Sequence, residues 1–350
     1  MKAVGYHQNL PLSDERALLD LDLPEPVPGP LDLLVAVQAV SVNPVDVKLR
    51  AGVAPEPGQA KVLGWDAAGT VLAVGAQVQG FAVGNRVFYA GAIQRPGSNA
   101  ERQVVDARIA AKMPATLDFA QAAALPLTSI TAWELLFERL GVRPATQAGR
   151  PETGGGAGQR LLVMGAAGGV GSILVQLARQ YTQLEIIATA SRPETVDWAL
   201  AMGAHHVIDH HRPLADELQR IGCMGPAGGV HLVASLTHTE QHYPALVQAL
   251  LPQGKLALLD ELSQPLDVMA LKRKSLSLHW EMMFTRSMFG TADIAAQGAL
   301  LAEVARAIDT GVLRHTLTRR FGPITAANLK QAHAWIESGR AIGKGVLEGF

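Results

Sequence analysis

The sequence predicts an α/β protein with a β-rich first domain followed by a domain built on a doubly wound parallel sheet. Up to about residue 115, short apolar strands such as LLVAVQAVSV alternate with turns that contain Pro and Gly. From about residue 160, short apolar runs alternate with helical segments of about ten residues, the pattern of βαβ units. We therefore expect domains at residues 1–128 and 129–280, and a C-terminal segment at 281–350 that partly returns to the first domain.

The individual elements follow this plan in chain order. A helix is predicted over residues 118–140, and the Gly- and Pro-rich stretch 141–159 reads as an exposed connection without structure of its own. The strands of the second domain are expected at RLLVMG, EIIATA, HVID, GVHLVASL and GKLALLD, with helices between them. After about Ser275 we expect one more strand in SLSLHWEMMF and a helix from about Ile294 to Gly311.

Composition narrows the classes of partner. Hydrophobic residues make up 48% of the 350 residues and charged residues 17%, which is typical of a globular chain. The net charge of −1, without a basic block, argues against nucleic acid and against an anionic membrane surface. The chain has one cysteine, Cys223, which indicates a reducing compartment. With no apolar run of about 18 residues and no signal-like N-terminus, the expected location is cytoplasmic and no membrane span is expected.

A glycine-rich turn in RLLVMGAAGGVGSILVQLAR lies directly between a predicted strand and a predicted helix, the context in which such a motif is informative. There a backbone without bulky side chains approaches a pyrophosphate, and the N–H groups of the helix start face its charge. The alternative is a turn whose glycines serve packing alone. The predicted cofactor-binding residues of this turn are Ala166, Gly168, Gly169, Val170 and Gly171.

The end of the second predicted strand bears on the choice of cofactor. A site that prefers NAD normally carries an acidic residue there for the ribose hydroxyls, whereas this chain has Ser191 and Arg192. A hydroxyl and a guanidinium suit a 2′-phosphate, so NADPH is predicted over NADH, with a solvated loop arginine as the alternative. Ser235, Leu236 and Thr237 follow the fourth strand, at the sheet edge where ligands bind in open α/β folds.

The whole layout resembles the medium-chain dehydrogenase/reductase superfamily. The motifs that carry the resemblance are SVNPVDVKLRAG, LGWDAAG, LTSITAWE, GAAGGVG and GKGVLEGF, and together they cover nearly the whole chain. The chain is most similar to the quinone oxidoreductase branch, which includes proteins labelled zinc-type alcohol dehydrogenase-like. The resemblance implies a GroES-like catalytic domain, a Rossmann domain that binds NADPH, and a homodimer or homotetramer.

The resemblance also allows a metal site to be tested by residue type. The three catalytic zinc ligands of zinc-dependent members match Asn43, Trp65 and about Leu127, which offer no thiolate, imidazole or carboxylate. A structural zinc lobe would need four cysteines. No metal is therefore predicted, and Asp66 is expected to bond to backbone or to a basic neighbour. Four histidines of the second domain read as a solvated turn, with a metal site as the alternative: His205, His206, His210 and His211.

Three residues near the NPVD motif are candidates for the reaction site. By resemblance Asn43 lies beside the nicotinamide and the substrate, where its amide could donate to the substrate oxygen. The alternative is an asparagine that satisfies backbone groups before Pro44. Asp46 matches an acid that packs beneath the site, with Arg50 as a possible partner. Lys48 stands where the quinone reductases tend to carry Tyr, and is either a proton or phosphate contact or an exposed loop lysine.

Further candidates come from the middle and the end of the chain. Thr128 and Thr131 match the helix start that lines the nicotinamide in relatives, although both could simply cap that helix. Phe284 belongs to a segment that often closes over the nicotinamide, with buried core as the alternative. Lys344 matches a lysine near the NADPH phosphates in some relatives.

These expectations lead to a function. Without a metal as Lewis acid, alcohol oxidation is disfavoured, and the resemblance implies zinc-independent, NADPH-dependent reduction of a quinone or an α,β-unsaturated carbonyl. One alternative is a zinc-dependent alcohol dehydrogenase. Another is a non-enzymatic NADPH-binding protein, crystallin-like or RNA-binding, although the balanced charge argues against RNA.

Overall fold

The computed structural model describes residues 1–350 and divides into two compact units. The first unit contains Met1–Ile130 and Phe284–Phe350, and the second contains Thr131–Met283. The C-terminal segment therefore belongs to the first unit, and the predicted α/β class is confirmed. None of the helices combines the length and the apolar character needed to cross a lipid bilayer.

The first unit is mainly β-structure with helices at its edges. Its strands are β1 (Lys2–Tyr6), β2 (Leu19–Asp22), β3 (Asp32–Ser41), β4 (Lys61–Val62), β5 (Asp66–Val74), β6 (Arg86–Ala90), β7 (Arg102–Asp106), β8 (Ala110–Lys112), β15 (Leu317–Arg320) and β16 (Lys344–Glu348). Its helices are η1 (Glu15–Ala17), α1 (Pro44–Gly52), η2 (Ala107–Ile109), α2 (Phe119–Ala123), α8 (Thr285–Phe289), α9 (Ala296–Asp309) and α10 (Ala326–Glu337), and α3 (Pro126–Trp133) contains the boundary with the second unit.

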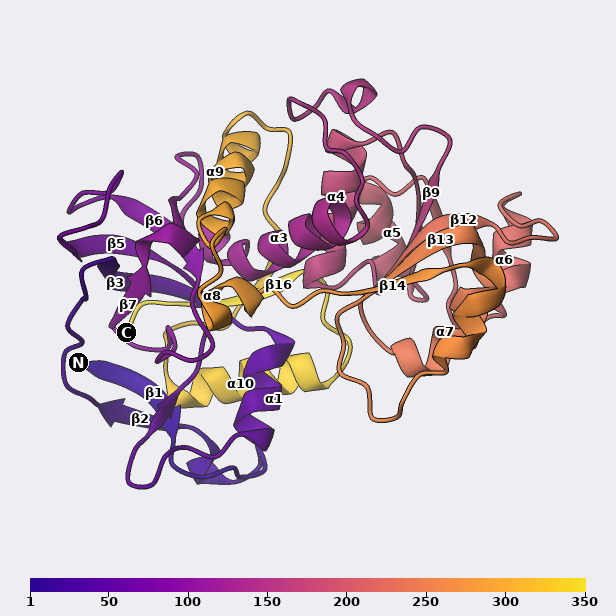
Figure 1. Cartoon of the computed structure of the whole chain (residues 1–350). Helices are drawn as coiled ribbons and strands as arrows, with labels where there is room; N and C mark the ends of the chain where they lie inside the picture. The colour runs from indigo at the N-terminus through magenta and orange to yellow at the C-terminus, as the bar shows by residue number, and fades with distance from the viewer. The chain divides into compact units, whose positions relative to one another are not determined.

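The main sheet of the first unit joins the two ends of the chain. Its strand order is β15-β16-β3-β5-β6-β8, with β7 also paired to β3, and β2-β1-β4 form a separate small sheet. β16 runs antiparallel to β3 with Val346 opposite Ser41, and β5 runs antiparallel to β3 with Asp66 opposite Ser41. The C-terminal α10 likewise lies beside α1 (Figure 1). This pairing brings the end of β3 and the starts of β5 and β16 together.

The second unit alternates strands and helices as expected. Its strands are β9 (Arg160–Met164), β10 (Glu185–Thr189), β11 (His206–Ile208), β12 (Val230–Ser235), β13 (Leu250–Leu258) and β14 (Ser277–Trp280). Its helices are η3 (Glu134–Arg139), η4 (Pro151–Thr153), α4 (Gly169–Tyr181), α5 (Pro193–Met202), α6 (Leu214–Arg220), α7 (Thr239–Ala249) and η5 (Val268–Lys274).

The parallel sheet of the second unit has the order β11-β10-β9-β12-β13-β14. The chain enters the sheet at the central strand β9 and adds β10 and β11 on one side of it. It then crosses to the other side of β9 and adds β12, β13 and β14, all parallel, as in doubly wound dinucleotide-binding folds. Leu162, Ile187 and Val233 point to one face and pack in one core cluster with Leu218 of α6 and Leu246 of α7. Helices α4 and α5 lie on the other side of the sheet (Figure 1). The carboxyl ends of β9 and β12 thus flank the crevice where ligands bind in such sheets.

The connection over residues 141–159 differs from its prediction. Ala145 and Ala148 are 7% and 6% exposed, and the Ala145 N–H donates to the Tyr181 carbonyl at 2.7 Å. The stretch also contains the short helix η4. Most of the connection is exposed or partly exposed, as predicted, but the expectation that it has no structure was wrong, because its backbone bonds to the carboxyl end of α4.

The single helix predicted over residues 118–140 is also divided in the structure. Helix α2 ends at Ala123, and α3 begins at Pro126, which lacks an N–H and so suits the first turn of a helix. The chain then continues as the π-helical turn η3 before Gly141, which has a φ of +70°. Helical periodicity was read correctly, but the proline marks a helix start within it.

Candidate functional site

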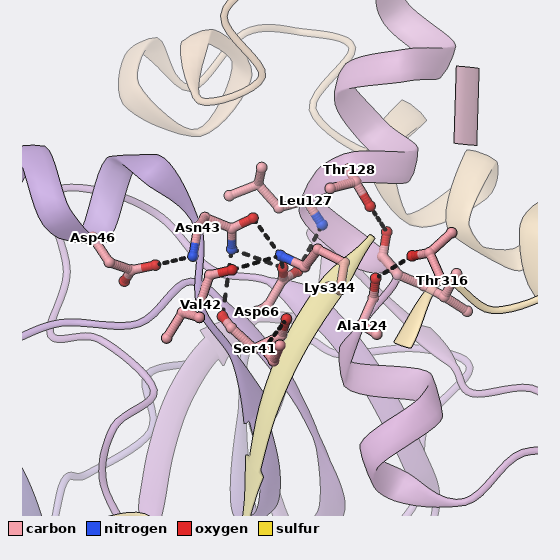
Figure 2. A network of polar contacts seen from close by, with 12 residues as sticks. Ser41, Val42, Asn43, Asp46, Asp66, Ala124, Leu127, Thr128, Thr316 and Lys344 are labelled. Carbon is pink, nitrogen blue, oxygen red and sulfur yellow. Dashed lines mark hydrogen bonds and ion pairs between the residues drawn. The ribbon is translucent and has the colours of Figure 1, made fainter. Parts of the chain in front are cut away.

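A buried polar network lies where three strand ends of the first unit meet (Figure 2). Asn43 follows β3, Asp66 begins β5 and Lys344 begins β16, and each is at most 3% exposed. The Lys344 ammonium donates to Asp66 Oδ2 at 2.9 Å, to the Val42 carbonyl at 3.0 Å and to Asn43 Oδ1. One buried cation and one buried carboxylate therefore balance each other, with Asn43 bridging them.

The Asp66 carboxylate is the centre of this network. Oδ2 accepts from Asn43 Nδ2 at 2.8 Å as well as from Lys344, and Oδ1 accepts from the Leu127 N–H at 2.7 Å. The prediction that Asp66 bonds to backbone or to a basic neighbour is confirmed, since it does both. Because the carboxylate accepts from three donors, its charge is compensated although the side chain is fully buried.

Lys344 and Asn43 are both held by these contacts. An ammonium has three N–H donors, and Lys344 has an acceptor for each of them inside the network. A role for Lys344 beside the NADPH phosphates stays a prediction. Asn43 Nδ2 donates to Asp66, and its other hydrogen faces the Ser41 carbonyl at 3.4 Å. The charges on either side orient the amide, whereas its donation to a substrate oxygen stays a prediction.

The acid Asp46 lies in the first turn of α1. Its Oδ2 accepts from the backbone N–H of Asn43 at 2.7 Å, and the side chain is 1% exposed. Burial raises the pKa of Asp46 to about 7, although the Asn43 N–H and the Lys344 charge act in the opposite direction. The suggested pairing with Arg50 was wrong, because Arg50 instead binds Glu337 at 2.5 Å.

Lys48 is exposed, as its alternative reading expected, but it lies on α1 and not on a loop. The prediction of a loop was wrong because Pro44 begins a helix and the carboxylate of Asp46, in the first turn of α1, binds the backbone N–H of Asn43. A role for Lys48 in proton transfer or phosphate binding stays a prediction.

The residues at the three zinc positions do not fit a catalytic zinc ion. The Asn43 amide oxygen accepts from an ammonium, the Trp65 indole donates to the Ala92 carbonyl at 3.3 Å, and Leu127 has a hydrocarbon side chain. Zinc needs thiolate, imidazole or carboxylate donors, and the charge of Lys344 opposes a second cation beside it. No step of a reaction is therefore assigned to a metal here.

Phe284 packs against Trp65 in the core of the first unit. The two rings meet edge to face with centroids 6.2 Å apart, and Phe284 is 5% exposed. This contact is the buried-core alternative for Phe284, and its role over a nicotinamide stays a prediction.

The glycine turn of the second unit fits a pyrophosphate. Gly168 is the N-cap of α4 without a side-chain cap, and Gly168, Gly169 and Val170 are partly exposed. A Cβ on Gly171 would lie 2.5 Å from the Gly165 carbonyl oxygen, so only glycine lets α4 start this close to β9. Ala166 is fully buried behind the turn. The open N–H groups of α4 are thus the part of this turn that can bind an anion.

Gly165 is a residue of this turn that the sequence reading missed. It follows β9 directly and has a φ of +78°, which favours glycine. A Cβ there would lie 2.9 Å from Thr237 Cγ2, so the turn after β9 and the end of β12 are in contact. The signal was present, because this glycine is the last residue of the predicted strand RLLVMG, directly before the turn.

The residues after β10 and β12 are accessible to different degrees. Ser191 and Arg192 are partly exposed, and Arg192 lies 3.4 Å from Glu194. Ser235 is fully buried and its hydroxyl bonds to Thr239 at 2.8 Å, whereas Leu236 is partly exposed and Thr237 is exposed. Their roles in cofactor binding stay predictions.

The hydroxyls of α3 are buried. Thr128 donates to the Leu125 carbonyl at 3.1 Å, and Thr128 and Thr131 are 2% and 5% exposed. The bond of Thr128 within its own helix turn corresponds to the structural alternative for that residue. Contacts of either threonine with a nicotinamide stay predictions.

A buried pair of acids in the second unit was not foreseen. Glu134 at the start of η3 and Glu281 after β14 are 1% and 3% exposed, and Arg139 Nε lies 2.9 Å from Glu281 Oε2. Burial and the neighbouring Glu134 raise the pKa of Glu281 against the effect of Arg139. No local pattern signals this pair, because it depends on strand β14 meeting η3.

Comparison with known proteins places this geometry in a family. Residues 29–115 match the alcohol dehydrogenase GroES-like domain, and residues 202–347 match a zinc-binding dehydrogenase domain. A zinc-type alcohol dehydrogenase-like protein of Staphylococcus epidermidis is 34% identical over 347 residues, which cover 99% of each chain. The crystal structure of a Rhizobium etli CFN 42 protein assigned to the zinc-dependent alcohol dehydrogenases is 54% identical, with a TM-score of 0.92 over 100% of this chain and 98% of that one.

More distant relatives carry names of reductases. A quinone oxidoreductase of Pongo abelii is 34% identical over 55% of this chain and 54% of its own length. A 2-methylene-furan-3-one reductase of Solanum lycopersicum is 34% identical over 53% of this chain and 46% of its own. A mycobacterial protein solved with NADPH is 28% identical, with a TM-score of 0.81 over 99% of both chains.

These matches and the two-unit fold define an oxidoreductase with a GroES-like unit and a parallel-sheet unit of Rossmann type. The chain belongs to the medium-chain dehydrogenase/reductase superfamily, in its quinone oxidoreductase branch.

Proposed function

We propose that this protein is a zinc-independent, NADPH-dependent reductase that transfers hydride to a quinone or an α,β-unsaturated carbonyl. The observation that carries the proposal is the set of groups at the zinc positions. There the Asn43 amide is held between the Lys344 ammonium and the Asp66 carboxylate, in place of a set of metal ligands. Acceptors that need no Lewis acid are the substrates that such a site suits best.

The cofactor proposal rests on the second unit. The backbone N–H groups at Gly169 and Val170 would hold the pyrophosphate, which Gly168, having no side chain, would let approach. Ser191 and Arg192 would hold the 2′-phosphate. NADPH, when bound, supplies the hydride. The chain's residues would bind and orient the cofactor through these contacts. The NADPH complex of the mycobacterial relative supports the choice of cofactor.

On the substrate side, Asn43, Lys48 and Thr131 are the proposed catalytic residues. The two partners of Asn43 hold its amide in one orientation. The amide hydrogen that faces the Ser41 carbonyl at 3.4 Å has the longer of the two contacts, and it would be the one to turn to a substrate oxygen and stabilise its charge. The names of the Pongo abelii and Solanum lycopersicum relatives support a quinone or an enone as the acceptor. We also propose a homodimer or homotetramer and a cytoplasmic location, as the family resemblance implies.

Turnover tests the reaction directly. NADPH oxidation should be measured with 1,4-benzoquinone and 9,10-phenanthrenequinone, before and after treatment with a chelator. Activity that survives chelation is the expected result. Tight NADPH binding without turnover of any quinone or enone would favour a binding protein, and activity lost on chelation and restored by zinc would favour an alcohol dehydrogenase mechanism.

A further inference from the structure

Three metal-ligating side chains meet at the edge of the second unit's sheet that lies opposite the glycine turn. Glu185 is the first residue of β10 and His206 the first of β11, and these strands are parallel neighbours. Cys223, the only cysteine of the chain, lies just beyond α6. The glycine turn follows the carboxyl end of β9, whereas these residues gather at the amino ends of β10 and β11.

The donor atoms of this cluster are already close together. Glu185 Oε1 lies 2.9 Å from His206 Nε2 and 4.0 Å from Cys223 Sγ, and all three donor atoms lie within 4.8 Å of one another. In a tetrahedral zinc shell the donors are about 2.0–2.3 Å from the ion, and hence roughly 3.3–3.7 Å apart. Shifts of about 1 Å would therefore convert the present arrangement into a ligand shell.

Access and charge also suit a cation. Glu185 and His206 are partly exposed, whereas Cys223 is 3% exposed. Solvent therefore reaches the cluster at Glu185 and His206, and the thiol is its buried member. Glu185 brings a carboxylate to the cluster, where it is bonded to both Arg160 and His206. Arg160 Nε binds Glu185 Oε2 at 2.8 Å, which leaves Oε1 to face the imidazole and the thiol.

We propose that Glu185, His206 and Cys223 form a binding site for a divalent transition-metal ion such as Zn²⁺. One sulfur, one nitrogen and one oxygen donor match zinc and cobalt, whereas Ca²⁺ and Mg²⁺ prefer oxygen alone. Binding releases the Cys223 thiol proton to solvent and needs the His206 proton on Nδ1, and water completes the shell. Arg160 would hold the non-coordinating carboxylate oxygen, the position of an outer-shell partner.

This site is independent of the proposed reductase function, and it differs from the sequence-based expectation of a solvated turn. His206 begins a strand and is bonded to Glu185. The sequence left a metal site open as the alternative for these histidines. The fold supports that alternative for His206, because it places Glu185 and Cys223 beside it.

Cobalt spectroscopy of the full chain tests the proposal, because a thiolate–Co²⁺ charge-transfer band can arise only from Cys223. Apo protein should be titrated with Co²⁺ and then with Zn²⁺, alongside Cys223→Ser, His206→Gln and His7→Gln as a histidine control in the first unit. We expect one Co²⁺ per chain with this band, its displacement by Zn²⁺, loss of the band in Cys223→Ser, and at least a tenfold weaker affinity in His206→Gln. His7→Gln should match the unchanged protein.

Two results would overturn the proposal. One is a folded protein without the band at saturating Co²⁺. The other is a His206→Gln variant that is folded, by circular dichroism, and binds Co²⁺ as tightly as the unchanged protein. Quinone turnover of the metal-free protein is measured separately, so a failure here leaves the proposed reductase activity untouched.

Discussion

At the scale of single residues, Lys344 decides the character of the buried network. Its ammonium offsets the Asp66 carboxylate in a region where neither side chain is more than 3% exposed. Such a pair gains little over a hydrophobic pair of the same shape, yet removing one partner leaves a buried charge without compensation. The structural consequence of the pair is that Asn43, bonded to both partners, has a fixed orientation.

A double-mutant cycle on this pair should show strong coupling. Lys344→Met should lower the free energy of unfolding by about 3–5 kcal/mol, because the buried Asp66 carboxyl then has lost its cationic partner and has only neutral donors around it. Adding Asp66→Asn to Lys344→Met should recover part of that loss. Urea unfolding of the unchanged protein, the two single variants and the double variant gives the coupling, and additive effects would contradict the charge-pair account.

His333 is a second residue whose environment sets a measurable property. It is fully buried in α10, and neither ring nitrogen has a hydrogen-bond partner. Burial, together with the charge of Arg50, lowers the pKa of His333 to about 3. Between about pH 6.5 and pH 3 the unfolded chain therefore binds a proton at this residue, whereas the folded chain does not.

Stability should fall with decreasing pH because of this residue. Since the folded pKa lies below the unfolded one, the unfolded state binds more protons between about pH 6.5 and pH 3, and the loss is about 2 kcal/mol from pH 7 to pH 5. His333→Leu should remove that part of the slope. Urea unfolding at both pH values measures it, and an unchanged slope in the variant would show that His333 does not titrate in this way.

At the scale of elements, the start of α4 is placed by close backbone contact. Gly171 approaches the Gly165 carbonyl and Ala166, and this contact sets the distance between the helix and β9. The same placement leaves the first N–H groups of α4 without a side-chain cap. Close packing on β9 and an open start of α4 thus occur together at this turn.

Gly171→Ala should damage both properties. The new Cβ would lie 2.5 Å from a carbonyl oxygen, so α4 must move, at a cost of about 1–3 kcal/mol. NADPH affinity, measured by fluorescence titration, should fall together with the stability measured in urea. Gly52→Ala is the matched control, because a Cβ there meets no atom within 4 Å. If Gly171→Ala behaves like this control, the close-contact account is wrong.

At the scale of the whole molecule, the chain leaves the first unit and later returns to it, and candidate site residues lie in both units. The first unit holds the Asn43–Asp66–Lys344 network, and the second holds the glycine turn with Ser191 and Arg192. The buried network needs both ends of the chain. The proposed contacts with the cofactor phosphates, by contrast, lie in the second unit, so cofactor binding would provide a separate readout.

Cofactor-dependent stabilisation should distinguish NADPH from NADH. A ligand that binds only the folded state at about 100 times its Kd stabilises by about 2.7 kcal/mol. We expect NADPH to raise the Tm more than NADH does at equal concentration, and Arg192→Ala to reduce the NADPH effect much more than the NADH effect. Thermal unfolding with each cofactor measures both, and equal losses would remove Arg192 as the basis for the preference.

The sequence by itself determined the alternation of strands and helices, the glycine turn and the lack of zinc ligands at Asn43, Trp65 and Leu127. These features are local, because period, turn chemistry and donor type can be read from neighbouring residues. Only the tertiary structure decided what Lys344 binds, since 301 residues separate it from Asn43 and strand pairing brings them together. The Glu185–His206–Cys223 cluster has the same origin, because side chains meet there from neighbouring parallel strands and a later loop.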